Sequence, residues 1–313
     1  MNLIPPFEFQ RVFVEPWTDN FASYGWIALM GFLVATACGL VGNYLILRRM
    51  ALVGDAISHS VLPGLAIAFL VANNRNSLAM FLGALGAGLV TTLLIELIHK
   101  KSRVKQDAAI GITFSSLFAI GVILISLFAS KVDLDQDCVL YGEIGTIPLM
   151  GPTPVVRMAC VTVLTIMLII VFYKELLVSS FDPGLAYSLG INATVVHYGL
   201  MCMLSIVVVS AFESVGAILV IAMLILPGAT ASLLSERLPR ILVLTVLHAA
   251  ISSVLGIHLA VWLDCSIAGA MVVMGSVLFG LAWIFSPQQG LFWRALRTRG
   301  NHCQTAPVVL SSE

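Results

Sequence analysis

Charged residues are scarce in this chain of 313 residues. They make up 10% of it, whereas a soluble domain carries roughly 25%. Hydrophobic residues make up 59%, and the mean hydropathy is +1.03. A single soluble core cannot bury this much apolar surface, so the composition excludes an ordinary soluble domain and indicates an all-α polytopic membrane protein.

Several motifs are also absent. The six cysteines are scattered and form no C-x-x-C pair, which excludes a zinc knuckle or a dithiol redox site. Cys138 and Cys265 fall on the predicted outer side, and whether they pair is left open. The chain has no G-x-x-x-x-G-K-[ST] motif, so it is not expected to hydrolyse ATP itself. No basic region precedes an apolar run in residues 1–20, so the first apolar segment is expected to remain as a permanent helix.

Apolar runs of about 20 residues, the length that spans a bilayer, occur nine times. The sixth and seventh runs are separated only by Phe212–Ser214, so a count of eight stays open. We expect an extracytoplasmic segment 1–24, one helical-bundle domain 25–285 and a cytoplasmic tail 286–313. The runs are 25–47, 52–72, 77–98, 108–129, 154–173, 194–210, 214–234, 241–262 and 267–285.

Lysine and arginine gather in alternate loops, which predicts the orientation in the membrane. Twelve of the sixteen basic residues lie in the loops after spans one, three, five, seven and nine. The N-terminus is therefore expected outside and the C-terminus in the cytoplasm. Fusing spans six and seven would place Arg237 and Arg240 outside, so nine spans are favoured.

Asp55 and His59 are ionisable residues in an otherwise apolar stretch. They lie four residues apart, about one helical turn, so their side chains project from the same helix face. Ionisable groups within a span are costly and usually mark an ion or substrate pathway. A carboxylate oxygen and an imidazole nitrogen also suit zinc or manganese, although a helix-packing polar pair remains the alternative. The pair lies near the inner end of its span, and we expect Gly54, Pro63 and Gly64 to break the helix and move the site toward the midplane.

The predicted cytoplasmic segment 174–193 contains a short helix by its end signals. Asp182 suits an N-cap, Pro183 the first helical position, and Gly190 the C-terminus. The helix is expected at about 183–189, with an apolar face of Leu185, Ala186 and Leu189. An apolar face at the cytoplasmic side predicts a protein partner.

Four stretches together resemble the ABC-3 type permeases, the membrane subunits of bacterial ATP-driven importers of manganese, zinc or iron. The most specific is Arg48–Gly64, which reads RRMALVGDAISHSVLPG. The others are Asp137–Ile144, the run from Phe181-Asp182-Pro183 to Leu189-Gly190-Ile191, and Gly216–Ala231. The similarity runs in order from about residue 25 to residue 285.

The resemblance implies a multi-pass protein of the bacterial cell membrane that binds no permanent cofactor and carries a divalent ion. Its implied partners are two cytoplasmic ATP-binding subunits, a second permease chain (identical or paralogous), an extracytoplasmic metal-binding protein and membrane lipid, but no nucleic acid. A second permease chain would supply the same Asp55–His59 pair and complete the ion's ligands.

The resemblance also implies residue roles. Asp55 and His59 contact the ion in transit. Asp137 and Glu143 belong to an acidic outer loop that either concentrates cations, contacts the binding protein or is simply solvated. The residues implied in coupling to the ATPases are Phe181, Asp182, Pro183, Leu185, Leu189 and Gly190.

Two other classes of protein are alternatives to an ATP-driven permease. A secondary metal transporter or channel needs no ATPase, and the apolar cytoplasmic helix argues against it. An intramembrane hydrolase would need a paired nucleophile and base, but Ser58 and His59 point about 100° apart on a helix. His248 and His258, inside span eight, are expected to be packing residues.

Overall fold

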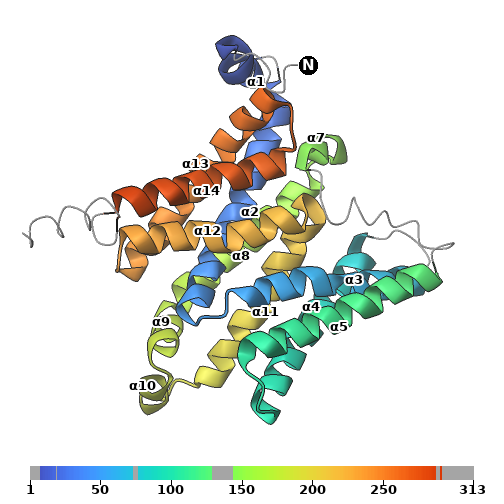
Figure 1. The fold of residues 1–313 in the computed structure, drawn as a ribbon, viewed down its shortest axis with the longest axis vertical. Coiled ribbons are helices and arrows are strands. Elements are labelled where there is room, and N and C mark those ends of the chain that lie inside the picture. Colours follow the sequence, from blue (N-terminus) through green and yellow to red (C-terminus); the bar gives the residue numbers. More distant parts are fainter. Residues whose placement is uncertain (1–7, 19, 73–76, 129–143, 287–289, 291–313) are drawn as a thin grey trace, which may run out of the picture.

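The protein was studied as a computed structural model that describes residues 8–18, 20–72, 77–128, 144–286 and 290. Regular elements within these ranges are all helical (Figure 1). The long helices are α2 (Phe21–Leu47), α3 (Leu52–Ala72), α4 (Ser77–Lys101), α5 (Gln106–Leu127), α8 (Thr153–Val171), α11 (Ala193–Val215), α12 (Ala217–Leu234), α13 (Leu238–Leu263) and α14 (Ile267–Phe285). The short ones are η1 (Gln10–Val14), α1 (Glu15–Thr18), η2 (Ile144–Thr146), α7 (Ile147–Met150), α9 (Tyr173–Phe181) and α10 (Pro183–Ser188).

The predicted all-α membrane architecture is confirmed. In the described ranges, eight helices are long and apolar enough to cross a bilayer, and the apolar stretch Ile218–Leu234 of α12 is shorter. Gly216, in the left-handed half of backbone space at φ 78°, separates α11 from α12, so predicted spans six and seven are two helices. The number of crossings and the orientation remain predictions.

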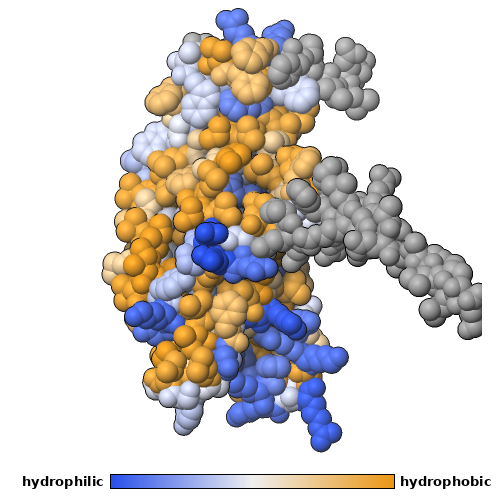
Figure 2. All heavy atoms as spheres, turned by 90° about the vertical axis from the view of Figure 1, so that its left-hand side faces the viewer, coloured by the Kyte–Doolittle hydropathy of each residue, from blue (hydrophilic) through white to orange (hydrophobic). Residues whose placement is uncertain are grey.

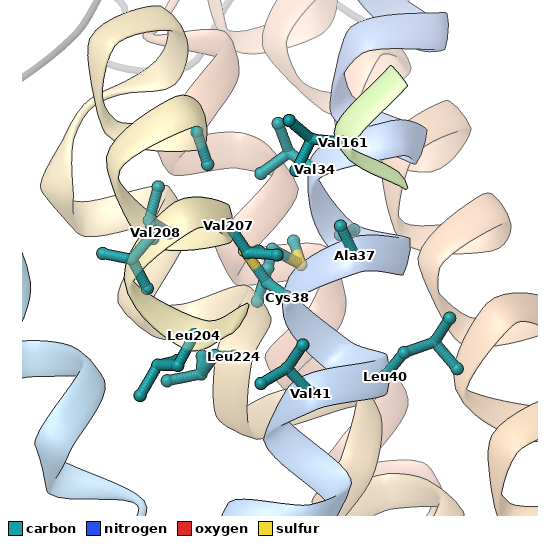
Figure 3. Packing of buried hydrophobic residues seen from close by; sticks show 14 of the residues in the cluster. Val34, Ala37, Cys38, Leu40, Val41, Val161, Leu204, Val207, Val208 and Leu224 are labelled. Carbon is teal, nitrogen blue, oxygen red and sulfur yellow. The ribbon is translucent and has the colours of Figure 1, made fainter. Parts of the chain in front are cut away.

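Helix α2 lies at the centre of the bundle. It packs against α12, α13 and α8, while α3, α4 and α5 pack together beside it (Figure 1). Figure 3 shows Cys38 and Val41 of α2 beside Leu204 of α11 and Leu224 of α12, and Val34 beside Val161 of α8. The burial of α2 explains why its apolar residues run around the whole helix instead of forming one stripe.

Small residues let the helices approach one another closely. A Cβ atom at Gly42 would overlap the carbonyl oxygen of Leu224, and one at Gly64 would overlap that of Gly83. Lipid is as apolar as the side chains, so close packing of small residues supplies much of the association between membrane helices. These contacts lock α2 to α12 and α3 to α4.

The outer surface of the bundle is apolar. Helices α4, α5 and α8 expose large side chains such as Leu82, Ile123 and Val163. On the face shown in Figure 2, hydrophobic residues cover most of the surface and hydrophilic residues gather toward the lower end. Such a surface is stable in lipid but not in water.

Helix α3 corrects one expectation. Pro63 and Gly64 do not break it, because α3 runs without interruption from Leu52 to Ala72 with Pro63 inside. Gly121 of α5 lies against Pro63, and a Cβ atom there would crowd the proline ring. A proline inside a membrane helix is tolerated where neighbouring helices pack closely around it.

Candidate functional site

Asp55 and His59 are brought together as the spacing predicts. His59 Nε2 lies 3.3 Å from Asp55 Oδ1, and the side chains are 25% and 41% exposed, respectively. Asp55 stands in the first turn of α3, where the helix dipole favours a negative charge. The His59 ring packs beside Phe114 and Phe118 of α5, at centroid distances of 5.2 and 6.1 Å. The phenylalanines hold the imidazole on the face that it shares with the carboxylate.

The pair alone is an incomplete metal site. In the part of the chain that the structure describes, no group of three or more His, Cys, Asp or Glu residues is arranged to hold a metal ion. A zinc site takes about four ligands, so water or another molecule must provide the rest. Ser58 and Ser60 are not further candidates, because both are fully buried and their hydroxyls turn back to donate to the carbonyls of Gly54 and Ala56 within α3.

The outer acidic loop lies outside the described residues. Asp137, Glu143 and Cys138 all fall in the range 129–143. A cation funnel, a contact with the binding protein and a pairing of Cys138 with Cys265 therefore stay predictions.

The predicted coupling segment forms the short helix expected from its end signals. Asp182 is the N-cap of α10, and its Oδ1 accepts from the backbone N–H groups of Gly184 and Leu185 at 2.9 and 3.0 Å. At the other end, Gly190 has φ 78°, and Ile191 N–H donates to the Ala186 carbonyl at 2.9 Å. This is the Schellman arrangement that a left-handed glycine permits.

The apolar face of α10 differs from the expected one. Ala186 is fully buried, so its predicted exposure is wrong, because α10 packs this side against α9 and α11. Leu185 and Leu189 are 50% and 60% exposed, and Phe181 extends the patch from the end of α9. Tyr187 is exposed as well, but two residues from either leucine it points to another side of the helix.

The two histidines of α13 have packing roles. His258 Nδ1 lies 2.8 Å from the Val12 carbonyl oxygen, and its ring stacks on Phe13 with centroids 4.6 Å apart. His248 Nε2 lies 3.3 Å from the Gly275 carbonyl oxygen. Each binds backbone, as expected for histidines that tie helices together.

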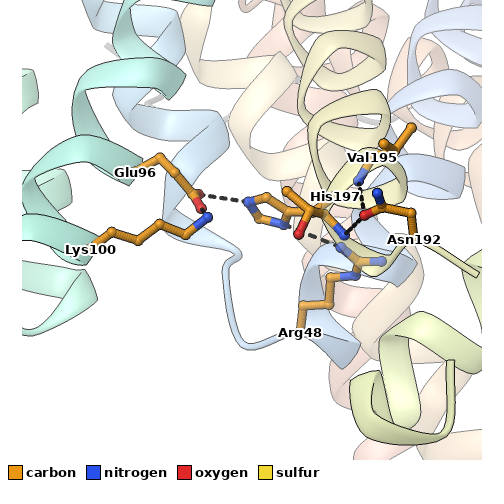
Figure 4. A network of polar contacts seen from close by, with 7 residues as sticks. Arg48, Glu96, Lys100, Asn192, Val195 and His197 are labelled. Atoms are coloured by element: carbon orange, nitrogen blue, oxygen red, sulfur yellow. Dashed lines mark hydrogen bonds and ion pairs between the residues drawn. The ribbon is translucent and has the colours of Figure 1, made fainter. Parts of the chain in front are cut away.

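The structure contains one polar cluster that the sequence does not predict. Arg48, His197, Glu96 and Lys100 lie in contact, although they come from three distant segments (Figure 4). The Glu96–Lys100 spacing of four residues is a readable helix ion pair, but nothing in the sequence links it to His197. Folding also brings three of the predicted cytoplasmic loops to one cavity of about 490 Å³, which Met50, Lys100 and Pro183 help to line.

Comparison with known proteins decides the family. The profile of the ABC 3 transport family matches residues 21–286. The chain belongs to this family. The family match covers α2 to α14, and so includes the Asp55–His59 pair and the α9–α10 segment.

Named relatives agree with the family. The chain is 46% identical over 282 residues to the manganese transport system membrane protein MntD of Bacillus subtilis, covering 87% of this chain and 95% of that protein. It is 45% identical over 293 residues to the zinc transport system membrane protein TroD of Treponema pallidum, covering 91% and 80%. The solved structure of PsaBC from Streptococcus pneumoniae in complex with Fab superposes with a TM-score of 0.77 at 34% identity, covering 92% and 98%.

Proposed function

We propose that this family member is the permease subunit of an ATP-driven importer of a divalent transition metal, manganese or zinc, with iron as a further candidate. Relatives named for manganese and for zinc are almost equally similar to it, so the metal is left as a choice between these ions. The permease is proposed to work with a second permease chain, identical or paralogous. Separate cytoplasmic ATP-binding subunits hydrolyse ATP, and an extracytoplasmic binding protein delivers the ion.

The Asp55–His59 pair carries the proposal. It offers one carboxylate oxygen and one imidazole nitrogen on a partly exposed face of a helix within an apolar bundle. Both donor types bind manganese and zinc. Two donors hold an ion weakly, and an ion in transit must leave as readily as it enters. A second permease chain that presents the same pair would raise the number of ligands to four.

The chemistry of the pair follows from its geometry. To bind a metal, His59 must present a ring nitrogen without its proton, and Asp55 must present a carboxylate oxygen as an anion. The 3.3 Å separation of Nε2 and Oδ1 is long for a charge-assisted hydrogen bond, so the pair is easily opened. Alternating access then requires that α3 move between an arrangement open to the outside and one open to the cytoplasm.

The proposal is tested by reconstituting the complete complex in proteoliposomes and measuring metal uptake. Uptake is followed with a radioactive isotope of the metal or by the quenching of an enclosed fluorescent dye. Asp55→Asn and His59→Gln preserve side-chain size and should lower uptake at least about tenfold, since even weaker perturbations of metal sites cost ~10–100-fold. Asp107→Asn is the matched control, since Asp107 is an exposed carboxylate in the first turn of the neighbouring helix α5. Its uptake should equal that of the unmodified complex.

Two results distinguish the alternatives. Uptake of manganese or zinc without ATP would favour a secondary transporter or channel. Full uptake by Asp55→Asn together with full uptake by His59→Gln would remove the pair from the pathway.

A further inference from the structure

Arg48 is the centre of a polar network where α2 ends. Its Nη2 donates to Ser179 Oγ at 2.8 Å and its Nε donates to Ser180 Oγ at 3.0 Å. Its Nη1 donates to His197 Nδ1 at 3.2 Å (Figure 4). Partial burial lowers the pKa of Arg48 from its ordinary value, but an arginine stays charged in proteins. Three bonds to one rigid guanidinium hold the end of α2 against α9 and α11.

The bonding determines the proton position on His197. Arginine only donates, so Nδ1 of His197 must accept, and the proton of the neutral ring is on Nε2. That nitrogen lies 2.8 Å from Glu96 Oε2, to which it donates, and Glu96 Oε1 pairs with Lys100 at 2.5 Å. The network therefore continues from Arg48 through His197 to α4. Asn192 caps the first turn of α11, which anchors His197 in place (Figure 4).

This cluster is not a second metal site. Glu96 is the carboxylate of the cluster, and Lys100 and Arg48 bring two permanent positive charges to it. Arg49 and His99 line the same cavity of about 490 Å³. The excess of positive charge repels a divalent cation, so the network must have another use.

One side of the network is continuous with the coupling segment. Ser179 and Ser180 are the last residues of α9 before Phe181, and Asp182 then caps α10. The two hydroxyls that bind Arg48 thus lie two to three residues from the N-cap of α10. A displacement of α10 pulls on them directly.

The other side of the network leads to the Asp55–His59 pair. Residues 48–51 form a tight turn in which Met50 N–H donates to the Leu45 carbonyl at 2.8 Å and Val53 N–H to the Met50 carbonyl at 3.1 Å. Arg49 adopts φ 58°, a left-handed conformation that is unfavourable for a non-glycine residue. The turn therefore has little freedom, and α3 begins at Leu52 with Asp55 in its first turn.

We propose that Arg48, held by Ser179, Ser180 and His197, is a positioning residue that transmits the movement of the α9–α10 segment to α3 and so to the Asp55–His59 pair. The proposal rests on the proposed function. Arg48 does not touch the ion. Its bonds to Ser179 and Ser180 tie the turn that precedes α3 to α9, so the first turn of α3 follows a movement of α9.

Coupling between ATP hydrolysis and uptake is the decisive measurement. The complete complex is reconstituted in proteoliposomes, and the metal ions taken up per ATP hydrolysed are counted. Arg48→Ala should assemble with the ATPases and hydrolyse ATP, but uptake per ATP should fall about tenfold or more, because losing one hydrogen bond to a charged group costs about that factor and Arg48 makes three. Arg48→Lys keeps the charge but cannot bind all three acceptors, so it should recover only part of the coupling.

Two further variants separate positioning from simple stability. The double variant Ser179→Ala with Ser180→Ala leaves Arg48 intact but removes its bonds to α9, and it should uncouple like Arg48→Ala. Lys101→Gln removes an exposed charge next to Lys100 without touching the network, and its coupling should equal that of the unmodified complex.

A second readout follows the movement itself. Hydrogen exchange of residues 52–59 should change when a non-hydrolysable ATP analogue binds the unmodified complex, and should not change in the serine double variant. The proposal would be overturned if the serine double variant took up as much metal per ATP as the unmodified complex. It would also be overturned if residues 52–59 of the double variant showed the same change in exchange on nucleotide binding as the unmodified complex. If the unmodified complex takes up no metal with ATP, the proposed function itself fails, which is a different result.

Discussion

The exposed apolar patch around α10 leads to a strong prediction about assembly. Leu185 is 50% exposed, so if the predicted coupling segment docks on an ATP-binding subunit, that subunit would cover about half of this side chain. Complete burial of a leucine is favourable by about 2 kcal/mol, and half of it by about 1 kcal/mol. Leu185→Asp loses this contribution and also brings a carboxylate into an apolar contact, which costs at least as much again.

The combined loss is therefore about 2 kcal/mol or more, which weakens association about 30-fold. The assay is a titration of the ATP-binding subunits against the permease held in nanodiscs. Leu185→Met is the matched control, since it keeps volume and apolar character and should bind within about threefold of the unmodified protein. If Leu185→Asp elutes as a folded protein and its affinity for the ATP-binding subunits stays within about threefold of the unmodified protein's, the prediction that these subunits dock on α10 is refuted.

Two other predictions concern packing within the bundle. Gly42→Ala inserts a methyl group where the Leu224 carbonyl lies, so overpacking should lower the free energy of unfolding by about 1–3 kcal/mol. Thermal unfolding in detergent should then show a lower midpoint. Gly86→Ala is the control, because no atom lies within 4 Å of its added Cβ, and its midpoint should stay unchanged. His258→Ala removes the contacts to the Val12 carbonyl and to the Phe13 ring, so amide exchange in residues 10–18 should become faster while exchange in α11 stays as before. Equal midpoints for the two glycine variants, or unchanged exchange in residues 10–18, would contradict the respective packing argument.

Local features of the site were accessible from the sequence. The four-residue spacing of Asp55 and His59 places them on one face of any α-helix, whatever surrounds it. The Asp182 cap and the left-handed Gly190 depend on backbone groups within a few residues of each other. The apolar runs likewise report the length of each membrane helix directly.

The misjudged features depend on neighbours that are distant in the sequence. Ala186 is buried because α9 and α11 cover one side of α10, which no periodicity within six helical residues reveals. Helix α3 passes Pro63 unbroken because Gly121 of α5 packs against the ring. In both cases the local sequence predicted one outcome, exposure of Ala186 or a break at Pro63, and the packing of another helix produced a different one.

By itself, the sequence determined that this protein is a bundle of apolar helices in a membrane, with the Asp55–His59 pair on one helix face and one short capped helix after Asp182. These features follow from composition and short-range geometry. Only the tertiary structure decided that Arg48 meets Ser180 and His197, which are 132 and 149 residues away, and that His197 meets Glu96, 101 residues away. Such contacts arise from the packing of whole helices, so the proposed link between α10 and the Asp55–His59 pair could be inferred only from the folded chain.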